Sequence, residues 1–185
     1  MLVSGRRGSS DVLAGLPKTQ AALAFAEDRH AGQRRQADGA PFIEHPREVA
    51  LLLYRAGAPD HVVAAGVLHD TIEKGGADID ELRTRFGRET AQLVVAVSED
   101  PEIPTYSRRK AALRAQVADA GPEALMVFAA DKISKVREYS GSTARPPSRL
   151  RLTHYRRCVE LLEWRMSDSP LVAQLRAEYD RSAFA

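Results

Sequence analysis

The apolar residues of this chain recur every three or four positions, which is the spacing of helices that pack on one face. No segment shows the strict alternation of apolar and polar residues that marks a half-buried strand. Prolines suited to a first helical turn and glycines suited to a helix end mark the boundaries. Helices are predicted over residues 17–30, 45–57, 59–75, 78–87, a stretch carrying 93–97, 107–120, a stretch from 122 through 131, and two more, the last starting near 170.

This series of elements predicts an all-α fold, a single helical bundle of about eight to ten helices. The chain has 185 residues, enough for one domain with a substantial core, and neither repeats nor a linker interrupt it. We expect that domain to span residues 17–185 and the glycine- and serine-rich residues 1–16 to form a disordered arm. Loops are predicted over residues 34–41, 98–106 and 140–147, and the second of these is placed where it could cover a site.

The composition of the chain indicates which kinds of binding partner to expect. A formal net charge of +2 and a pI near 8.8 are only mildly basic, which weighs against a nucleic-acid partner. The single cysteine, Cys158, excludes an internal disulfide, and no apolar stretch approaches the roughly 20 residues that span a bilayer. We therefore expect a cytoplasmic protein with a small-molecule partner and no membrane partner. Whether the chain pairs with itself as a homodimer stays open.

Basic residues gather in a few places that could bind phosphate groups, namely residues 34–35, 108–110, 132–137 and 145–151. A solvated helix face explains such a cluster equally simply. We favour that interpretation for residues 145–151 but not for Arg34 and Arg35. His61 and His154 have no evident partner in the sequence and are interpreted as ordinary surface residues.

The most informative motif is the adjacent pair His69-Asp70, which follows the apolar run of residues 62–68 in the helix predicted over residues 59–75. His45 and Asp131 stand in similar settings at the edges of other apolar segments. Two histidines and two aspartates form a mixed nitrogen and oxygen set that suits a divalent cation, and such a cation would offset the cost of burying them. A hydrogen-bonded core histidine, an N-cap or an ion pair would explain single members of the set equally well.

Glu73 lies four residues after His69 and three after Asp70, so the three side chains fall on neighbouring faces of one helix. A carboxylate one turn from a metal site is well placed to orient water or to accept a proton. An exposed carboxylate near a helix C-terminus is the simpler interpretation, although the helix dipole makes that position unfavourable.

The order His…His-Asp…Asp resembles the signature of the HD superfamily of metal-dependent phosphohydrolases. Further blocks are similar to the hydrolase domain of RelA/SpoT proteins, and above all to the stand-alone small alarmone hydrolases. These blocks are His30-Ala-Gly-Gln-Arg-Arg35, Gly39-Ala-Pro-Phe-Ile-Glu-His-Pro46, Leu68-His-Asp-Thr-Ile-Glu73, Phe86-Gly87 and Ala130-Asp-Lys132. The resemblance extends over roughly residues 16–175, nearly the whole chain.

The resemblance implies an HD-domain fold and hydrolysis of the 3′-pyrophosphate of guanosine tetra- or pentaphosphate with one divalent ion, Mn²⁺. It implies that the metal ligands are His45, His69, Asp70 and Asp131, and that Glu73 is the first acid of the family's catalytic Glu-Asp pair. It also implies that the nucleotide lies against Arg34, Arg35 and Tyr155.

Several positions depart from the family pattern. The second acid of the catalytic pair is replaced by Lys74, which could pair with Asp70 or with substrate phosphate. A family asparagine near the nucleotide corresponds to Lys135, and two family basic residues correspond to Gln36 and Pro101. These changes suit a hydrolase with altered substrate choice, such as an adenosine analogue of the alarmone or another nucleotide. They equally suit an impaired enzyme that binds nucleotide as a regulator.

Overall fold

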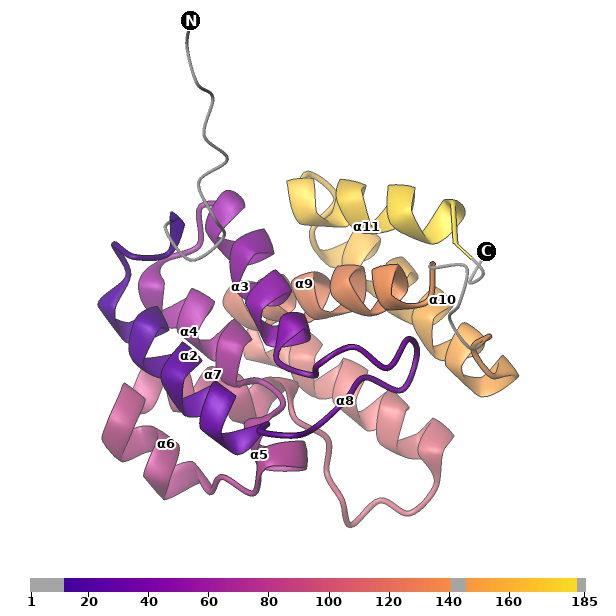
Figure 1. Cartoon of the computed structure of the whole chain (residues 1–185). Coiled ribbons are helices and arrows are strands. Elements are labelled where there is room, and N and C mark those ends of the chain that lie inside the picture. The colour runs from indigo at the N-terminus through magenta and orange to yellow at the C-terminus, as the bar shows by residue number, and fades with distance from the viewer. Residues whose placement is uncertain (1–11, 141–145, 183–185) are drawn as a thin grey trace, which may run out of the picture.

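The computed structural model describes residues 12–140 and 146–182, and these residues are helical almost throughout (Figure 1). The helices are α2 (Pro17–Arg29), α3 (Glu44–Arg55), α4 (Asp60–Leu68), α5 (Thr71–Gly75), α6 (Ile79–Phe86), α7 (Arg88–Val97), α8 (Tyr106–Ala120), α9 (Pro122–Glu138), α10 (Arg149–Arg165) and α11 (Pro170–Asp180). The one β contact within the described residues is an isolated antiparallel bridge between Arg34 and Pro41. The predicted all-α fold of about eight to ten helices is confirmed.

Helix α9 is the central element of the bundle. It packs against α3, α4 and α7 from the N-terminal half and against α8, α10 and α11 from the C-terminal half (Figure 1). Every residue from 127 to 134 is buried, including the polar residues Asp131, Lys132 and Ser134. A helix that is covered all round forms the core of a bundle, so its polar side chains need partners inside the protein.

Helix α4 is the second core helix, because every residue from 62 to 68 is buried. It packs against α2, α3, α7 and α9. This burial on several sides explains why the segment is a continuous apolar run without a polar face. Because α4 is buried up to its last residue, the next two residues, His69 and Asp70, lie in the interior beside α9.

The His69–Asp70 pair does not lie inside one helix, so the single helix predicted over residues 59–75 is wrong. Helix α4 ends at Leu68 and α5 begins at Thr71. Nδ1 of His69 lies 2.7 Å from the carbonyl oxygen of Gly66, and the Thr71 hydroxyl donates to the carbonyl of Leu68 at 2.7 Å. Side chains that take backbone acceptors in this way compete with the helical ladder and end it.

Other predicted boundaries differ in detail. The side chain of Asp78 accepts a hydrogen bond from the backbone N–H of Glu81 at 2.8 Å, so Asp78 is the N-cap of α6, at the predicted start of that helix. Helix α8 begins at Tyr106, one residue before the predicted start at residue 107, and its N-cap is Thr105. In the part of the chain that the structure describes, no helix combines the length and apolar character needed to cross a membrane.

The N-terminal boundary also differs. Residues 1–11 of the predicted arm and residues 141–145 of the predicted loop lie outside the described residues. Residues 12–16 are described, and Leu13 is only 2% exposed and packs in the core. Its carbonyl accepts a hydrogen bond from the Gln20 side chain at 3.1 Å. The packed part of the chain therefore begins before the predicted residue 17.

Candidate metal centre and surrounding pocket

Four side chains that are distant in sequence converge on one point inside the bundle. The Nε2 atoms of His45 and His69 lie 3.1 Å apart. Oδ1 of Asp131 lies 3.3 Å from Nε2 of His45 and 3.6 Å from Nε2 of His69. Oδ2 of Asp70 lies 3.6 and 3.4 Å from the same two atoms. The structure thus brings together the four residues that were expected to bind metal.

Three separate elements hold these side chains. His45 stands in the first turn of α3, Asp131 lies in the middle of α9, and His69 and Asp70 occupy the break between α4 and α5. All four residues are buried, and His45 is completely inaccessible to solvent. Because the packing of α3 and α4 against α9 fixes the backbone, the donor atoms meet without a flexible loop in the set.

Hydrogen bonds on the far side of each ring indicate where its lone pair points. Nδ1 of His69 lies 2.7 Å from the Gly66 carbonyl, an acceptor, so this nitrogen carries the proton. Nδ1 of His45 lies 3.1 Å from Oε1 of Glu138 and 2.8 Å from Oγ of Ser134. A ligand histidine in proteins typically donates its other N–H in this way. Both Nε2 lone pairs then face each other and the two carboxylates.

This donor set fits a metal ion. Bonds of about 2.1 Å from one ion to several ligands place neighbouring donor atoms roughly 3 to 3.4 Å apart. The five separations that involve a histidine, from 3.1 to 3.6 Å, are close to that range. Two imidazole lone pairs and two carboxylates repel one another unless a proton or a metal ion lies between them. His45, His69 and Asp131 therefore form a group that could hold a metal ion, and Asp70 lies beside both histidines.

The charges around the centre keep both carboxylates ionised. Burial acts to raise the pKa of Asp131, but the Lys132 ammonium at 2.5 Å and the two histidines hold it well below its usual range. For Asp70, burial is likewise outweighed by His69 and by Lys74, and its pKa is lowered. Ionised carboxylates are the form that a metal binds.

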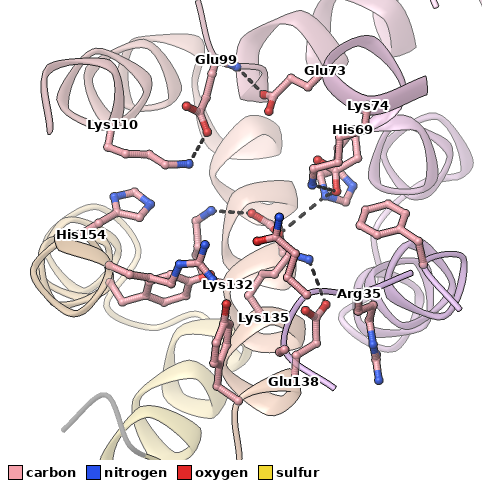
Figure 2. A pocket seen from close by; sticks show the side chains of 18 of the residues that line it. Arg35, His69, Glu73, Lys74, Glu99, Lys110, Lys132, Lys135, Glu138 and His154 are labelled. Atoms are coloured by element: carbon pink, nitrogen blue, oxygen red, sulfur yellow. Dashed lines mark hydrogen bonds and ion pairs between the residues drawn. The ribbon is translucent and has the colours of Figure 1, made fainter. Parts of the chain in front are cut away.

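A cavity of about 510 Å³ opens above the metal-ligand cluster. It is lined by three of the four candidate ligands and by Glu73, Lys74, Lys135, Arg34, Arg35 and Tyr155. Figure 2 shows His69 and Lys74 on one wall and Lys110 and His154 on the wall opposite, with Lys132 between them. The predicted site residues therefore surround a single cavity, and His45 lies beneath its floor.

Glu73 projects into the upper part of this cavity (Figure 2). One carboxylate oxygen accepts a hydrogen bond from the backbone N–H of Glu99 at 2.5 Å. Glu73 is exposed, as the simpler interpretation expected, but desolvation by the residues around it raises its pKa, and the nearby charge of Asp70 acts in the same direction. Glu99 also pairs with Lys110 and with Arg109, the latter at 2.7 Å. The predicted loop over residues 98–106 thus forms one wall of the cavity.

Both lysines that depart from the family pattern pair with carboxylates at the metal centre. Nζ of Lys74 lies 2.8 Å from Oδ2 of Asp70, and Nζ of Lys135 lies 2.9 Å from Oε1 of Glu138. The same two ammonium groups lie 4.7 and 5.2 Å from the centre of the Phe42 ring. Of the two partners considered for Lys74, the structure pairs it with Asp70.

The remaining predicted contacts line the cavity in different settings. Arg34 is exposed and donates a hydrogen bond to the Gly39 carbonyl at 2.9 Å, whereas the guanidinium of Arg35 pairs with Asp38. Tyr155 is buried, with its ring on the cavity wall. The turn at residues 38–39, where Gly39 takes a positive φ of 74°, holds the arginine loop in this shape.

The far wall includes Lys110, Arg151 and His154. Lys110 belongs to the cluster of residues 108–110 that could bind phosphate, whereas the favoured interpretation of residues 145–151 as a solvated helix face is wrong for Arg151. The interpretation of His154 as a surface residue is wrong, since it is 4% exposed and its Nδ1 accepts a hydrogen bond from Arg114 at 2.7 Å. His61 is half-buried and pairs with Glu123 at 3.0 Å. The register of α10 is the available signal, because Arg151 and His154 lie on the same helix face as Tyr155 and Cys158.

Known proteins share these features. A family model described as an HD domain matches residues 22–154. Human guanosine-3′,5′-bis(diphosphate) 3′-pyrophosphohydrolase MESH1 is 35% identical over 134 residues, which cover 71% of this chain and 74% of that protein. The MESH1 protein of Danio rerio is 33% identical over 137 residues, with the same coverage.

Two solved structures are similar in fold. A metazoan ortholog of SpoT that hydrolyses ppGpp matches with a TM-score of 0.78 at 23% identity, over 89% of this chain and 95% of that chain. The protein lmo0812 of Listeria monocytogenes matches with a TM-score of 0.65 at 28% identity, over 72% of this chain and 94% of that chain. The helical arrangement that holds the four candidate ligands is therefore a known fold.

Proposed function

The chain belongs to the HD domain family and is a homologue of the MESH1 3′-pyrophosphohydrolases, and from this premise we propose that it removes the 3′-pyrophosphate from an alarmone-type purine nucleotide. The substrate is guanosine tetra- or pentaphosphate or the adenosine analogue. The observation that carries the proposal is the convergence of two histidines and two aspartates at the floor of a cavity lined by cations.

One divalent ion, Mn²⁺, is the proposed cofactor, held by His45, His69, Asp70 and Asp131. When bound, such an ion lowers the pKa of water and neutralises phosphate charge. The mixed nitrogen and oxygen donors suit Mn²⁺, and two ionised aspartates supply most of the negative charge it needs.

Glu73 is the proposed acceptor of the proton from the attacking water. It faces the cavity and stands one turn beyond the ligand His69. The hydrogen bond from the backbone of Glu99 fixes the direction of its carboxylate. A base with a raised pKa holds a transferred proton better near neutral pH than an ordinary surface carboxylate does.

The proposed substrate contacts come from the cationic walls. Arg34 and Arg35 line the cavity from the loop of residues 34–41, where a planar guanidinium can grip phosphate with two hydrogen bonds or stack on a purine. Lys135 supplies a further positive charge beside the metal centre, and the Tyr155 ring closes the inner wall. A strongly anionic nucleotide is the ligand that these side chains favour.

Product analysis by chromatography tests the proposal. The two substrates are guanosine 5′-diphosphate 3′-diphosphate and its adenosine analogue. Each is incubated with the protein in the presence of Mn²⁺ and, in a separate reaction, with excess chelator in place of the metal. We expect pyrophosphate and the corresponding nucleoside 5′-diphosphate to form from at least one substrate, and only with the metal. Absence of these products from both substrates at saturating Mn²⁺ would overturn the proposal, and a panel of other nucleotides then identifies a different substrate.

A second candidate function rests on the contact between Lys74 and Asp70. An ammonium 2.8 Å from a candidate ligand competes with a metal for that carboxylate, which suits a nucleotide-binding regulator with impaired turnover. The variant Lys74→Asp restores the family's acid pair. A gain in turnover of tenfold or more would identify the natural chain as impaired, whereas a loss would show that Lys74 serves the reaction of this enzyme.

Two further expectations accompany the proposal. A free buried thiol at Cys158, whose pKa burial raises to about 11, agrees with a reducing cytoplasmic setting. Self-association as a homodimer stays a prediction that measurement of the molar mass in solution can check.

A further inference from the structure

The ring of His45 is held from behind by two side chains of the central helix. Its Nδ1 atom lies 2.8 Å from Oγ of Ser134 and 3.1 Å from Oε1 of Glu138. His45 and Ser134 are fully buried, and Glu138 is 6% exposed. Glu138 also lines the cavity, where it pairs with Lys135, whereas Ser134 does not line it. The mechanism above gives neither Ser134 nor Glu138 a role.

The other hydrogen-bond partners of Ser134 and Glu138 show which atom is the donor in their contacts with Nδ1 of His45. The Ser134 hydroxyl donates its single proton to Oε2 of Glu48 at 2.8 Å, so its oxygen is left to accept from His45. Oε1 of Glu138 is paired with the ammonium of Lys135 at 2.9 Å, as an ionised carboxylate acceptor. Both neighbours of Nδ1 are therefore acceptors, and Nδ1 must carry the proton.

We propose that Ser134 and Glu138 are positioning residues that hold His45 in its Nδ1–H form and direct its Nε2 lone pair into the metal site. The inference rests on the metal site of the proposed function. A ligand histidine that lacks such acceptors can rotate or change tautomer, and the loss of outer-shell partners weakens metal binding by about 10- to 100-fold.

The acceptors are themselves fixed from outside. Oε1 of Glu48 accepts a hydrogen bond from Arg137 at 2.8 Å, and the same guanidinium donates to Oε1 of Glu178 at 2.7 Å. Glu178 belongs to α11, so the chain of contacts runs from His45 through α9 to the C-terminal helix. Held at both ends, Glu48 cannot turn away from Ser134 without breaking an ion pair.

Metal binding to the stripped protein tests the inference directly. The affinity for Mn²⁺ alone is measured by titration for the wild type, Ser134→Ala, Glu138→Ala and the double variant. We expect each single variant to bind less tightly, the double variant to lose about 10- to 100-fold, and Ser134→Thr, which keeps a hydroxyl, to recover most of the loss. Equal affinity in the wild type and the double variant would overturn the inference.

Matched controls separate positioning from general damage. Ser98→Ala removes a buried hydroxyl that donates to the Val94 carbonyl, and Glu123→Gln changes a carboxylate paired with His61 away from the site. Both are expected to leave Mn²⁺ affinity unchanged. If the double variant does not fold, the two single variants and Ser134→Thr decide by the same criterion.

A spectroscopic readout reports the tautomer itself. With Zn²⁺ as a diamagnetic ion, the Nδ1–H proton of His45 should give a slowly exchanging NMR signal that is lost or exchanges faster in the double variant. An unchanged signal would contradict the inference. Wild-type protein that binds Mn²⁺ but releases no pyrophosphate would refute the proposed reaction alone, whereas active enzyme whose variants bind Mn²⁺ equally well would refute only this inference.

Discussion

At the residue scale, a variant of Glu73 can distinguish a loss of turnover from a loss of metal binding. The variant Glu73→Gln keeps the shape of the side chain and an oxygen that accepts from the Glu99 backbone, but it cannot take a proton. We expect turnover to fall by about 10²- to 10⁴-fold while Mn²⁺ affinity stays within a few-fold of wild type. Steady-state kinetics and metal titration of the same preparation measure both quantities.

The exposed residue Glu102 supplies the control for that experiment. It lies on the same loop as Glu99 but does not line the cavity, so Glu102→Gln should behave as wild type. Unchanged turnover in Glu73→Gln would reject the role assigned to Glu73. A parallel loss of metal binding would instead assign its carboxylate to the metal centre.

His154 gives a prediction about pH. Burial and the charges of Lys132, Lys110 and Arg114 lower its pKa to about 2 from an ordinary 6.5. The ring therefore stays neutral in the folded protein, while the unfolded chain takes up a proton as the pH falls below about 6.5. Stability conferred by this neutral ring is full above pH 6.5 and declines as the pH falls, by at most about 1.4 kcal/mol per pH unit.

Thermal unfolding at several pH values measures that contribution. In His154→Gln the amide oxygen can still accept from Arg114, but no group titrates there. We expect the loss of stability between pH 7 and pH 5 to be smaller in this variant than in wild type. Parallel curves for the two proteins would show that His154 does not carry the effect.

At the element scale, the close approach of α3 and α4 depends on Gly66. A Cβ atom at this position would lie 2.3 Å from Cδ1 of Leu53 and 3.1 Å from Cγ1 of Val49. Both neighbours are fully buried side chains of α3, the helix that carries His45. We expect Gly66→Ala to destabilise the fold by about 1–3 kcal/mol, the usual cost of an overpacked core, as measured by denaturant unfolding.

Two further variants test whether the clash with Leu53 causes the loss of stability in Gly66→Ala. Gly15→Ala adds the same methyl group where no atom lies within 4 Å, and it should leave the unfolding midpoint unchanged. Gly66→Ala combined with Leu53→Ala should cost less than the sum of the two single changes, because the second vacates the space that the first needs. Simple additivity would contradict the predicted clash.

Local signals explain which elements could be predicted from the sequence. The capping side chain of Asp78, the first-turn proline at 17 and the glycine at 57 act within a few residues, and α6, α2 and α3 lie where these signals place them. The break before α5 could not be predicted, because the ring of His69 and the hydroxyl of Thr71 compete there for backbone carbonyls. The spacing of apolar residues does not predict that competition.

The residues of the candidate site likewise differ in whether local sequence signals could predict them. The four proposed ligands are recognisable because polar residues at the edges of apolar runs need a partner. Arg151 could not be distinguished from an exposed arginine, since its place on the cavity wall depends on how α10 meets α8 and α9. Leu13 was likewise assigned to a disordered arm because only tertiary packing buries it.

At the scale of the whole molecule, the candidate metal centre joins three parts of the chain. His45 comes from α3, Asp70 from the break before α5, and Asp131 from α9. An ion that binds these residues only when they are assembled stabilises the folded state over the unfolded one. The metal is thus expected to act as a crosslink between these helices.

Thermal unfolding with and without Mn²⁺ measures this crosslink. At a free concentration of about 100 times the dissociation constant, we expect the metal to stabilise the wild type by about 2.7 kcal/mol and to raise the unfolding temperature. Asp131→Asn should lose most of that gain, whereas Asp119→Asn, an exposed aspartate of α8, should keep it. If Mn²⁺ raised the unfolding temperature of Asp131→Asn as much as that of the wild type, the ion would be bound elsewhere, and the assignment of the four converging side chains as its ligands would fail.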